Sequence, residues 1–296
     1  MSNKLKVHLS LFIVTLIYGA TFTIAKEVMP VYVKPFAFII LRIWTAVIFI
    51  FIFHRMYVKE IVRDKKDLIK LFVCSVFGVL ANMLLFFKGL SLTVPINGAV
   101  LMMNTPIFVV VFATFYLKEK LSVQKISGIM IAAVGAILLM GGTKISFQSE
   151  TVAGDLMVTA NAIIYAFYLV YVTPLTQKYH PLTITLYTFL FGAVLVIPFG
   201  WNEFTQIEWN SIPTKIYLFI LFVTIGATFV TYALNAYALK HASPSIVGSY
   251  IYLQPVLATM IAIFSGRDFL SLQKMIFIII IFTGVYLVSK KKLIKV

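Results

Sequence analysis

Ten long apolar segments divide this chain, and each has about the length that a helix needs to cross a lipid bilayer, roughly 20 mostly apolar residues. They cover residues 8–28, 35–54, 68–88, 95–117, 125–142, 154–173, 182–200, 215–238, 244–265 and 273–289. Of the 296 residues, 61% are hydrophobic and 12% are charged, and this charged fraction is about half that of a soluble domain. The sequence therefore predicts an all-α, polytopic membrane protein with ten transmembrane helices and no room for a soluble domain.

The positive charges are distributed unevenly between the two sides of the membrane that this topology defines. A net charge of +15 would suggest a nucleic-acid partner in a soluble protein. Here the basic residues lie between apolar segments, where they orient helices, so we expect no nucleic-acid partner. Most of the 25 Lys and Arg residues fall on the side that holds both chain ends. The positive-inside rule therefore predicts that both termini are cytoplasmic.

An internal repeat relates the two halves of the chain. Residues 90–139 align with residues 239–288 without a gap, at an offset of 149 residues. A shared Leu-Ser-x-Gln-Lys sequence stays in register, as do two proline pairs, Pro95 with Pro244 and Pro106 with Pro255. The repeat predicts two five-helix units, residues 1–143 and 154–290. Because five is an odd number, the second unit enters the membrane from the opposite side, so inverted repeats are expected.

Inverted repeats are typical of secondary transporters, whose halves exchange conformations around a site near the middle of the membrane. We therefore expect a carrier that moves a small metabolite by alternating access, without a cofactor. No Asp or Glu lies mid-membrane, so uncoupled transport or exchange is at least as consistent with the sequence as proton coupling. The alternatives are a membrane-embedded enzyme and a permease subunit of an ATP-driven transporter. The four histidines lie at helix ends without an HExxH motif, so the sequence predicts no metal site and no enzyme.

Several motifs resemble those of the EamA-type branch of the drug/metabolite transporter superfamily. They are YGATFTIAK at 18–26, the spacing of Pro35, Arg42 and Ala46, the proline pairs, and LKEKLSVQKISGIMIAAVGAILLMGG at 117–142. The resemblance covers nearly the whole chain. It implies ten helices in a bacterial inner membrane and transport of small metabolites, often the export of amino acids or related compounds. Tyr18 stands where the family often has Trp.

Arg42 is a permanent cation inside the second apolar segment. At 1.5 Å per residue it lies about 10 Å beyond Pro35. An arginine within the membrane costs about 2.5–3.5 kcal/mol even on an insertion scale. Its guanidinium could hold a substrate carboxylate or phosphate in a bidentate contact. It could instead bond helix carbonyls or reach the outer interface. The sequence favours this structural role and leaves the substrate role open.

Neutral polar and aromatic residues recur at helical spacing; Asn161, Tyr165 and Tyr168, for example, share one helix face. In a membrane such groups face protein or water rather than lipid. They predict either an aromatic, hydrogen-bonding cavity for a small polar or zwitterionic solute, or interhelical hydrogen bonds worth roughly 0.6 kcal/mol each. The candidate substrate-binding residues are Tyr18, Arg42, Asn82, Asn104, Asn161, Tyr165, Tyr168, Tyr232, Asn235 and Tyr252.

Two further pairs of residues are candidates for gating. Lys26 and Glu27 end the first predicted helix, where they form either a gate or an interfacial ion pair of little energetic value. Pro106 and Pro255 fall inside predicted helices, where a proline removes a backbone hydrogen bond and kinks the helix. These kinks are either bending points for alternating access or a fixed feature of shape. The expected partners are a small-molecule substrate and the lipid bilayer, and the sequence does not indicate an oligomeric state.

Overall fold

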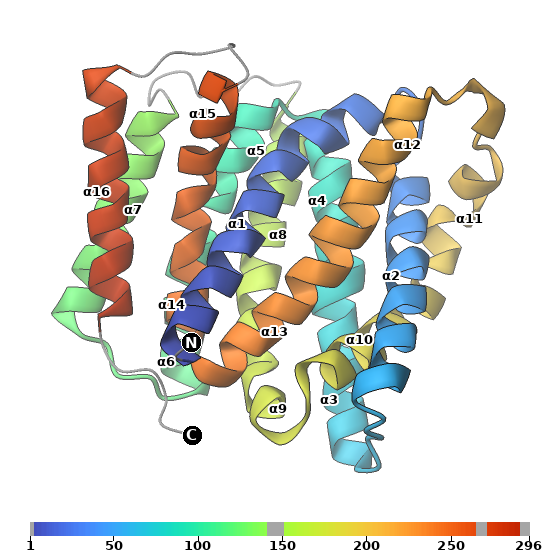
Figure 1. The fold of residues 1–296 in the computed structure, drawn as a ribbon, viewed down its shortest axis with the longest axis horizontal. Helices are drawn as coiled ribbons and strands as arrows, with labels where there is room; N and C mark the ends of the chain where they lie inside the picture. Colours follow the sequence, from blue (N-terminus) through green and yellow to red (C-terminus); the bar gives the residue numbers. More distant parts are fainter. Residues whose placement is uncertain (1–2, 141–150, 265–270, 291–296) are drawn as a thin grey trace.

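The computed structural model of the chain describes residues 3–140, 151–264 and 271–290, and in these ranges it contains helices but no β-strand. Figure 1 shows the helices running side by side between two ends of the molecule, with the start of α1 and the end of α16 at the same end. The α-helices are α1 (Asn3–Val28), α2 (Pro35–Tyr57), α3 (Lys65–Ser75), α4 (Ala81–Leu92), α5 (Pro95–Met102), α6 (Thr105–Tyr116), α7 (Val123–Leu139), α8 (Val152–Tyr171), α9 (Thr173–Lys178), α10 (Pro181–Leu195), α11 (Ile197–Thr205), α12 (Thr214–Leu221), α13 (Thr231–His241), α14 (Pro244–Ser249), α15 (Gln254–Phe264) and α16 (Leu272–Ser289). Two π-helical segments, η1 (Val76–Leu80) and η3 (Phe222–Val230), and two 3-10 segments, η2 (Trp209–Ser211) and η4 (Tyr250–Leu253), complete the set.

Seven helical stretches in the described ranges are long and apolar enough to cross a membrane. They are Lys4–Val28, Pro35–Tyr57, Lys65–Leu92, Asn97–Tyr116, Val152–Lys178, Thr214–His241 and Leu272–Ser289. Helices α10 and α11, bent by 66°, form an eighth if they count as one span. Large apolar side chains such as Phe115 are exposed on the outer surface, as expected of a face that contacts lipid. The prediction of a helical membrane protein is confirmed. Helical segments occur in all ten predicted ranges, but ten membrane crossings stay a prediction.

Two stretches of the repeat are broken at equivalent positions. Helix α5 is separated from α6 by a tight turn at Met103 and Asn104, and the offset of 149 residues places this turn opposite η4, between α14 and α15. In the first break the N–H of Asn104 donates to the carbonyl of Leu101 at 3.2 Å. The helix after each break has a proline, Pro106 or Pro255, as its second residue, and proline has no N–H to continue the hydrogen-bond ladder. The predicted kinks are therefore present as breaks, and their role in bending stays a prediction.

A second pair of irregularities also recurs in the repeat. Segment η1 lies between α3 and α4, and the offset of 149 residues places it within η3, between α12 and α13. A π-helical turn holds an extra residue, and such turns occur frequently at functional sites. Gly78 in η1 and Ala227 in η3 are equivalent under this offset. The carbonyls of both residues accept hydrogen bonds from side chains of other helices.

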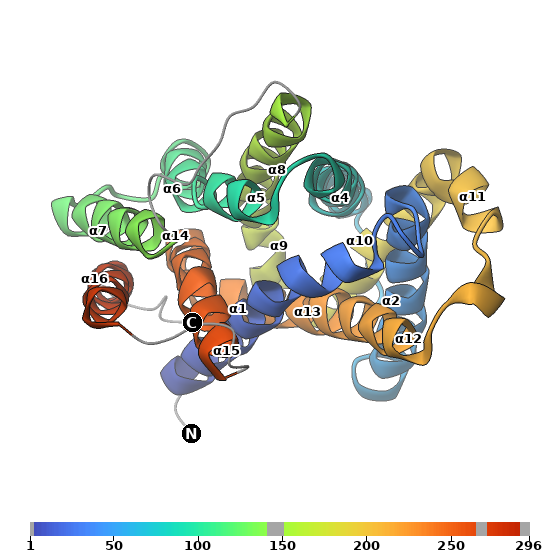
Figure 2. The ribbon, with the colours of Figure 1, turned by 90° about the horizontal axis from the view of Figure 1, so that it is seen from above.

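Helices α7 and α16, which are also equivalent in the repeat, pack side by side (Figure 2), and small residues lie in their contact. A Cβ atom on Gly284 would lie 2.5 Å from the carbonyl oxygen of Gly128 and 2.5 Å from the backbone nitrogen of Ala132. Small residues allow such close approach, which matters because lipid provides no hydrophobic drive between helices. This pair lies at one side of the bundle, whereas α1 passes through the middle (Figure 2). Side chains of α1 are therefore placed to meet both halves of the chain.

Candidate functional site

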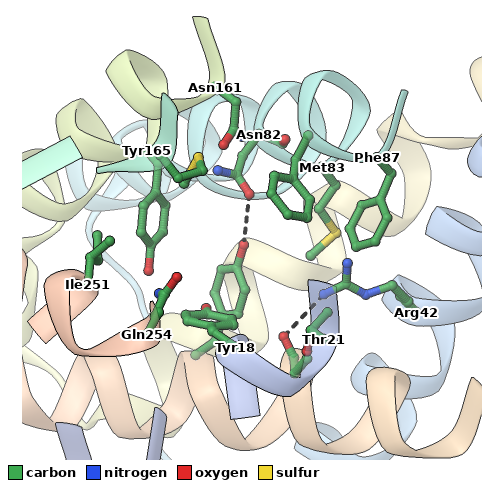
Figure 3. Close-up of a pocket in the computed structure, with 14 residues that line it drawn as sticks. Tyr18, Thr21, Arg42, Asn82, Met83, Phe87, Asn161, Tyr165, Ile251 and Gln254 are labelled. Carbon is green, nitrogen blue, oxygen red and sulfur yellow. Dashed lines mark hydrogen bonds between the residues drawn. The ribbon is translucent and has the colours of Figure 1, made fainter. Parts of the chain in front are cut away.

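A cavity of about 70 Å³ lies in the middle of the bundle. Its walls come from both halves of the chain: α1, α2, α4 and α5 from the first, and α8, η3, α13, η4 and α15 from the second. Six predicted site residues line it, namely Tyr18, Arg42, Asn82, Asn161, Tyr165 and Tyr232. Figure 3 shows Arg42 and Phe87 at one end and Tyr165, Ile251 and Gln254 at the other.

A smaller pocket of about 10 Å³ adjoins the cavity on the side where α1 begins. Asn235, a seventh predicted residue, lines this pocket, and its side-chain amide donates to the hydroxyl of Tyr165 at 3.2 Å. Tyr18 and Tyr165 line both pockets and stand at equivalent places in the two halves, within Ile-Tyr-Gly and Ile-Tyr-Ala. These two tyrosines therefore mark the boundary between the two spaces.

The guanidinium of Arg42 is held by the second half of the chain. Its Nε donates to Thr228 Oγ1 at 2.9 Å, and its Nη2 donates to the carbonyl of Ala227 at 3.1 Å. The ring of Phe87 lies 4.3 Å from the guanidinium carbon, a cation–π arrangement. The side chain is 4% exposed, so it does not reach the outer interface. Arg42 both bonds a helix carbonyl, as the structural role requires, and lines the cavity, as the substrate role requires.

Two polar side chains of the cavity wall, Asn161 and Tyr232, bond backbone carbonyls of the first half. The amide of Asn161 donates to the carbonyl of Asn82 at 2.6 Å, which ties α8 to α4. The hydroxyl of Tyr232 donates to the carbonyl of Gly78 at 2.6 Å, so this bond stabilises the π-helical turn η1. The Oδ1 atom of Asn161 is buried and has no hydrogen-bond partner in the described part of the chain. A buried acceptor without a donor is costly, so Asn161 is a wall residue whose hydrogen bonding a bound solute could complete.

Three predicted site residues lie outside both pockets. Tyr168 packs between Tyr165 and Tyr232, with ring centroids 6.1 and 6.2 Å away. Tyr252 is fully buried, and its hydroxyl has no partner among the described residues. Asn104 donates to the carbonyl of Leu101 at the helix break and does not line the cavity. Tyr168 and Tyr252 therefore support the walls, and Asn104 supports the helix break. They were predicted as lining residues because the polar face of a helix extends beyond the part of it that borders the cavity.

The predicted gating residues at the end of α1 separate into different contacts. Glu27 forms an ion pair with Lys215, at the start of α12, with Oε2 and Nζ 2.9 Å apart. Glu27 pairs with Lys215 and not with its neighbour Lys26, because adjacent side chains on a helix point in different directions. The contact links the two halves of the chain at the end opposite the termini, where a gate would lie. A gating role for Lys26 and Glu27 stays a prediction.

Asp155 is a buried acid in the first turn of α8, the helix that carries Asn161 and Tyr165. Its carboxylate accepts from Thr93 Oγ1 at 2.5 Å and from Thr151 Oγ1 at 3.1 Å, and the side-chain amide of Asn97 lies at 3.4 Å. These contacts join the first turn of α8 to the junction of α4 and α5. Asp155 does not line either pocket. Across the described ranges, no three His, Cys, Asp or Glu side chains gather as a metal site would need.

The apolar part of the wall was not predicted from the sequence. Met83, Phe86 and Phe87 line the cavity from α4. Apolar residues of a membrane helix look alike in the sequence whether they face lipid or a cavity. The spacing of Asn82 and Phe86, one helical turn apart, is the one local signal that could have placed Phe86 on the wall.

Comparison with known proteins agrees with this architecture. The sequence pattern of the EamA-like transporter family matches residues 5–141 and again 152–290. The chain belongs to the EamA-like transporter family. The resemblance that its motifs carry is therefore confirmed, and the second match indicates a duplicated domain.

Individual relatives are similar over most of their length. The chain is 26% identical over 291 residues to Uncharacterized transporter YyaM of Bacillus subtilis, covering 95% of this chain and 94% of that protein. It is 26% identical over 225 residues to an Uncharacterized transporter of Archaeoglobus fulgidus, covering 74% and 75%. One crystal structure shares the fold, with a TM-score of 0.77 over 96% of this chain and 97% of that one, at 19% identity. The family and its named relatives are transporters, and the chain is an integral membrane protein that handles a small molecule.

Proposed function

We propose that this protein is a secondary transporter that carries a small metabolite across the cell membrane by alternating access, with the central cavity as the solute site. The observation that carries the proposal is the composition of the cavity wall. Both halves of the chain contribute to it, and equivalent residues, Tyr18 and Tyr165, face the same space. A site between two repeats is the arrangement that lets their exchange of conformation expose a solute to either side.

The finer features of the proposal come from the sequence. Two inverted five-helix repeats would give ten membrane crossings, and the positive-inside rule would place both termini in the cytoplasm. The recurrence of the helix breaks and the π-helical turns at an offset of 149 residues supports the duplication. Amino acids or related compounds are the proposed solutes, and export is the proposed direction. A reporter fused to the C-terminus, active only on one side of the membrane, tests the orientation.

Transport by the purified protein tests the function. The protein is reconstituted in liposomes without nucleotide, and uptake of labelled amino acids, organic acids, nucleobases and sugars is compared with empty liposomes. We expect at least one class of solute to equilibrate faster with the protein present. Tyr165→Ala should reduce that uptake, whereas Tyr286→Ala, the same change on the exposed face of α16, should not. Absence of protein-dependent uptake across the whole panel would refute the carrier, and uptake that requires ATP would favour a permease subunit.

A further inference from the structure

The charge of Arg42 is the feature of the cavity that the transport proposal leaves unexplained. A guanidinium has five N–H donors, and the two protein contacts of Arg42 are with neutral oxygens, Thr228 Oγ1 and the carbonyl of Ala227. Within the described ranges, the four ion pairs of the protein all involve lysine, and none involves Arg42. A cation that is 4% exposed therefore faces the cavity with no protein anion to compensate it.

The rest of the wall contains no acid. The residues that line the cavity are aromatic, apolar or neutral and polar, and Arg42 is the one charged side chain among them. Phe86, Phe87 and Tyr165 contribute aromatic rings to this lining, and aromatic rings pack favourably against a planar, apolar body. The buried Oδ1 of Asn161 lacks a donor, and a hydroxyl or N–H on the solute could supply one.

We propose that the transported solute is an organic monoanion, an aromatic monocarboxylate whose carboxylate binds Arg42 and whose ring lies among the aromatic side chains. The inference rests on the proposed function and narrows its solute class to the acids related to aromatic amino acids. In a site of low dielectric constant, one fixed cation and one bound carboxylate leave no net charge. A zwitterionic amino acid would leave its ammonium group without an anion, and an unpaired buried charge is strongly unfavourable.

A set of three solutes that share one body isolates the effect of charge. These are 3-(4-hydroxyphenyl)propionate, which is an anion, tyrosine, which is a zwitterion, and tyramine, which is a cation. We expect reconstituted protein to take up the anion in preference to tyrosine by roughly tenfold or more, a factor that corresponds to about 1.4 kcal/mol. Tyramine should be taken up least. Preference for tyrosine over the anion would overturn the inference and leave the carrier intact.

Substitution of Arg42 tests whether this cation is the cause of the preference. Arg42→Gln should weaken binding of the anion by roughly thirtyfold or more, as expected when one partner of a buried charged pair is removed. The effect on tyramine should be much smaller or reversed in sign. Arg42→Lys keeps the charge but not the planar fork of donors, so its affinity for the anion should lie between those of the parent and of Arg42→Gln. Equal losses for all three solutes, with the thermal midpoint unchanged, would overturn the assignment of Arg42 to the carboxylate.

A change elsewhere on the wall keeps the test independent of whether Arg42 variants fold. Asn82→Asp adds a negative charge to the cavity and keeps the oxygen that faces the hydroxyl of Tyr232 at 3.4 Å. It should lower the ratio of anion to tyrosine uptake by roughly tenfold. Asn202→Asp makes the same chemical change at an exposed position and likewise keeps its oxygen as an acceptor for Gln206, and it should leave the ratio unaltered. An unchanged ratio in Asn82→Asp would overturn the inference. If no solute of a broad panel is taken up, the proposed function fails as well; if other classes are transported but not the anion, this inference alone fails.

Discussion

Replacement of Gly284 by alanine should separate α7 from α16 and destabilise the protein. The added Cβ would lie 2.5 Å from Gly128 O, 2.5 Å from Ala132 N and 2.7 Å from Ala132 Cβ. Ordinary contact begins near 3.4 Å, so the gap must widen by about 1 Å. Two of the three obstructing atoms are backbone atoms, and no change of rotamer can move them. One helix must therefore shift as a whole against the other.

The expected cost follows from the kind of atom that must move. Overpacking a tight contact costs about 1–3 kcal/mol, and a backbone contact belongs at the upper end of that range. Alanine recovers up to about 1 kcal/mol because it forms helix better than glycine. The net loss for Gly284→Ala is therefore about 2 kcal/mol, or a fall in Tm of about 5 °C at about 2–4 °C per kcal/mol for a chain of comparable size. Gly135→Ala should cost less, since its two contacts at 2.9 Å are with side-chain γ-carbons of Ile280 and Ile281, and the nearest backbone atom, the nitrogen of Ile281, lies at 3.1 Å.

Thermal unfolding of the purified, detergent-solubilised variants measures these differences. Gly226→Ala is the matched control, because its nearest contact would be 3.6 Å away; we expect its Tm to stay within about 2 °C of the parent. The order of Tm should be Gly226→Ala, then Gly135→Ala, then Gly284→Ala as the lowest. A Tm for Gly284→Ala equal to that of Gly226→Ala would show that the helices are not packed as closely as their backbone contacts indicate.

Three further variants probe contacts near and outside the cavity. Tyr232→Phe removes the donor to the carbonyl of Gly78. Because such a hydrogen bond is worth about 1 kcal/mol, Tm should fall by about 3 °C, and transport should slow. Unchanged Tm and transport would contradict a supporting role for that bond. Burial lowers the pKa of His180 below its usual 6.5, and the neutral side chain caps α10 by accepting a backbone N–H. This cap gives its full stabilisation above pH 6.5 and loses it as the pH falls through the lowered pKa. His180→Asn, a cap that does not titrate, should therefore lose less Tm than the parent between about pH 7 and pH 5; identical pH profiles would exclude His180 as the source of the pH dependence of Tm. Glu27→Gln breaks the exposed ion pair with Lys215 and should change stability by less than about 1 kcal/mol. A large change in transport rate at unchanged Tm would identify a gate, whereas an unchanged transport rate would identify an interfacial ion pair without a gating role.

Local backbone chemistry and side-chain polarity are the features that the sequence alone determined. Long apolar segments become helices because a backbone in lipid must satisfy its own hydrogen bonds. Pro106 and Pro255 interrupt their helices because proline lacks an N–H, wherever the rest of the chain lies. Asn82, Asn161 and Tyr165 could be placed away from lipid for a similar reason, since a polar group in a membrane needs protein or water beside it.

Only the tertiary structure decided which groups meet. The acceptors of Arg42 are Thr228 and the carbonyl of Ala227, more than half the chain away. Both residues belong to a π-helical segment that no residue pattern predicted. The same holds for Phe87, which covers the guanidinium. In a membrane, an apolar side chain is about as stable against lipid as against other apolar side chains, so hydrophobicity does not tell which of the two it contacts. Packing of the two halves around α1 supplies that information, and with it the uncompensated charge at the centre of the protein.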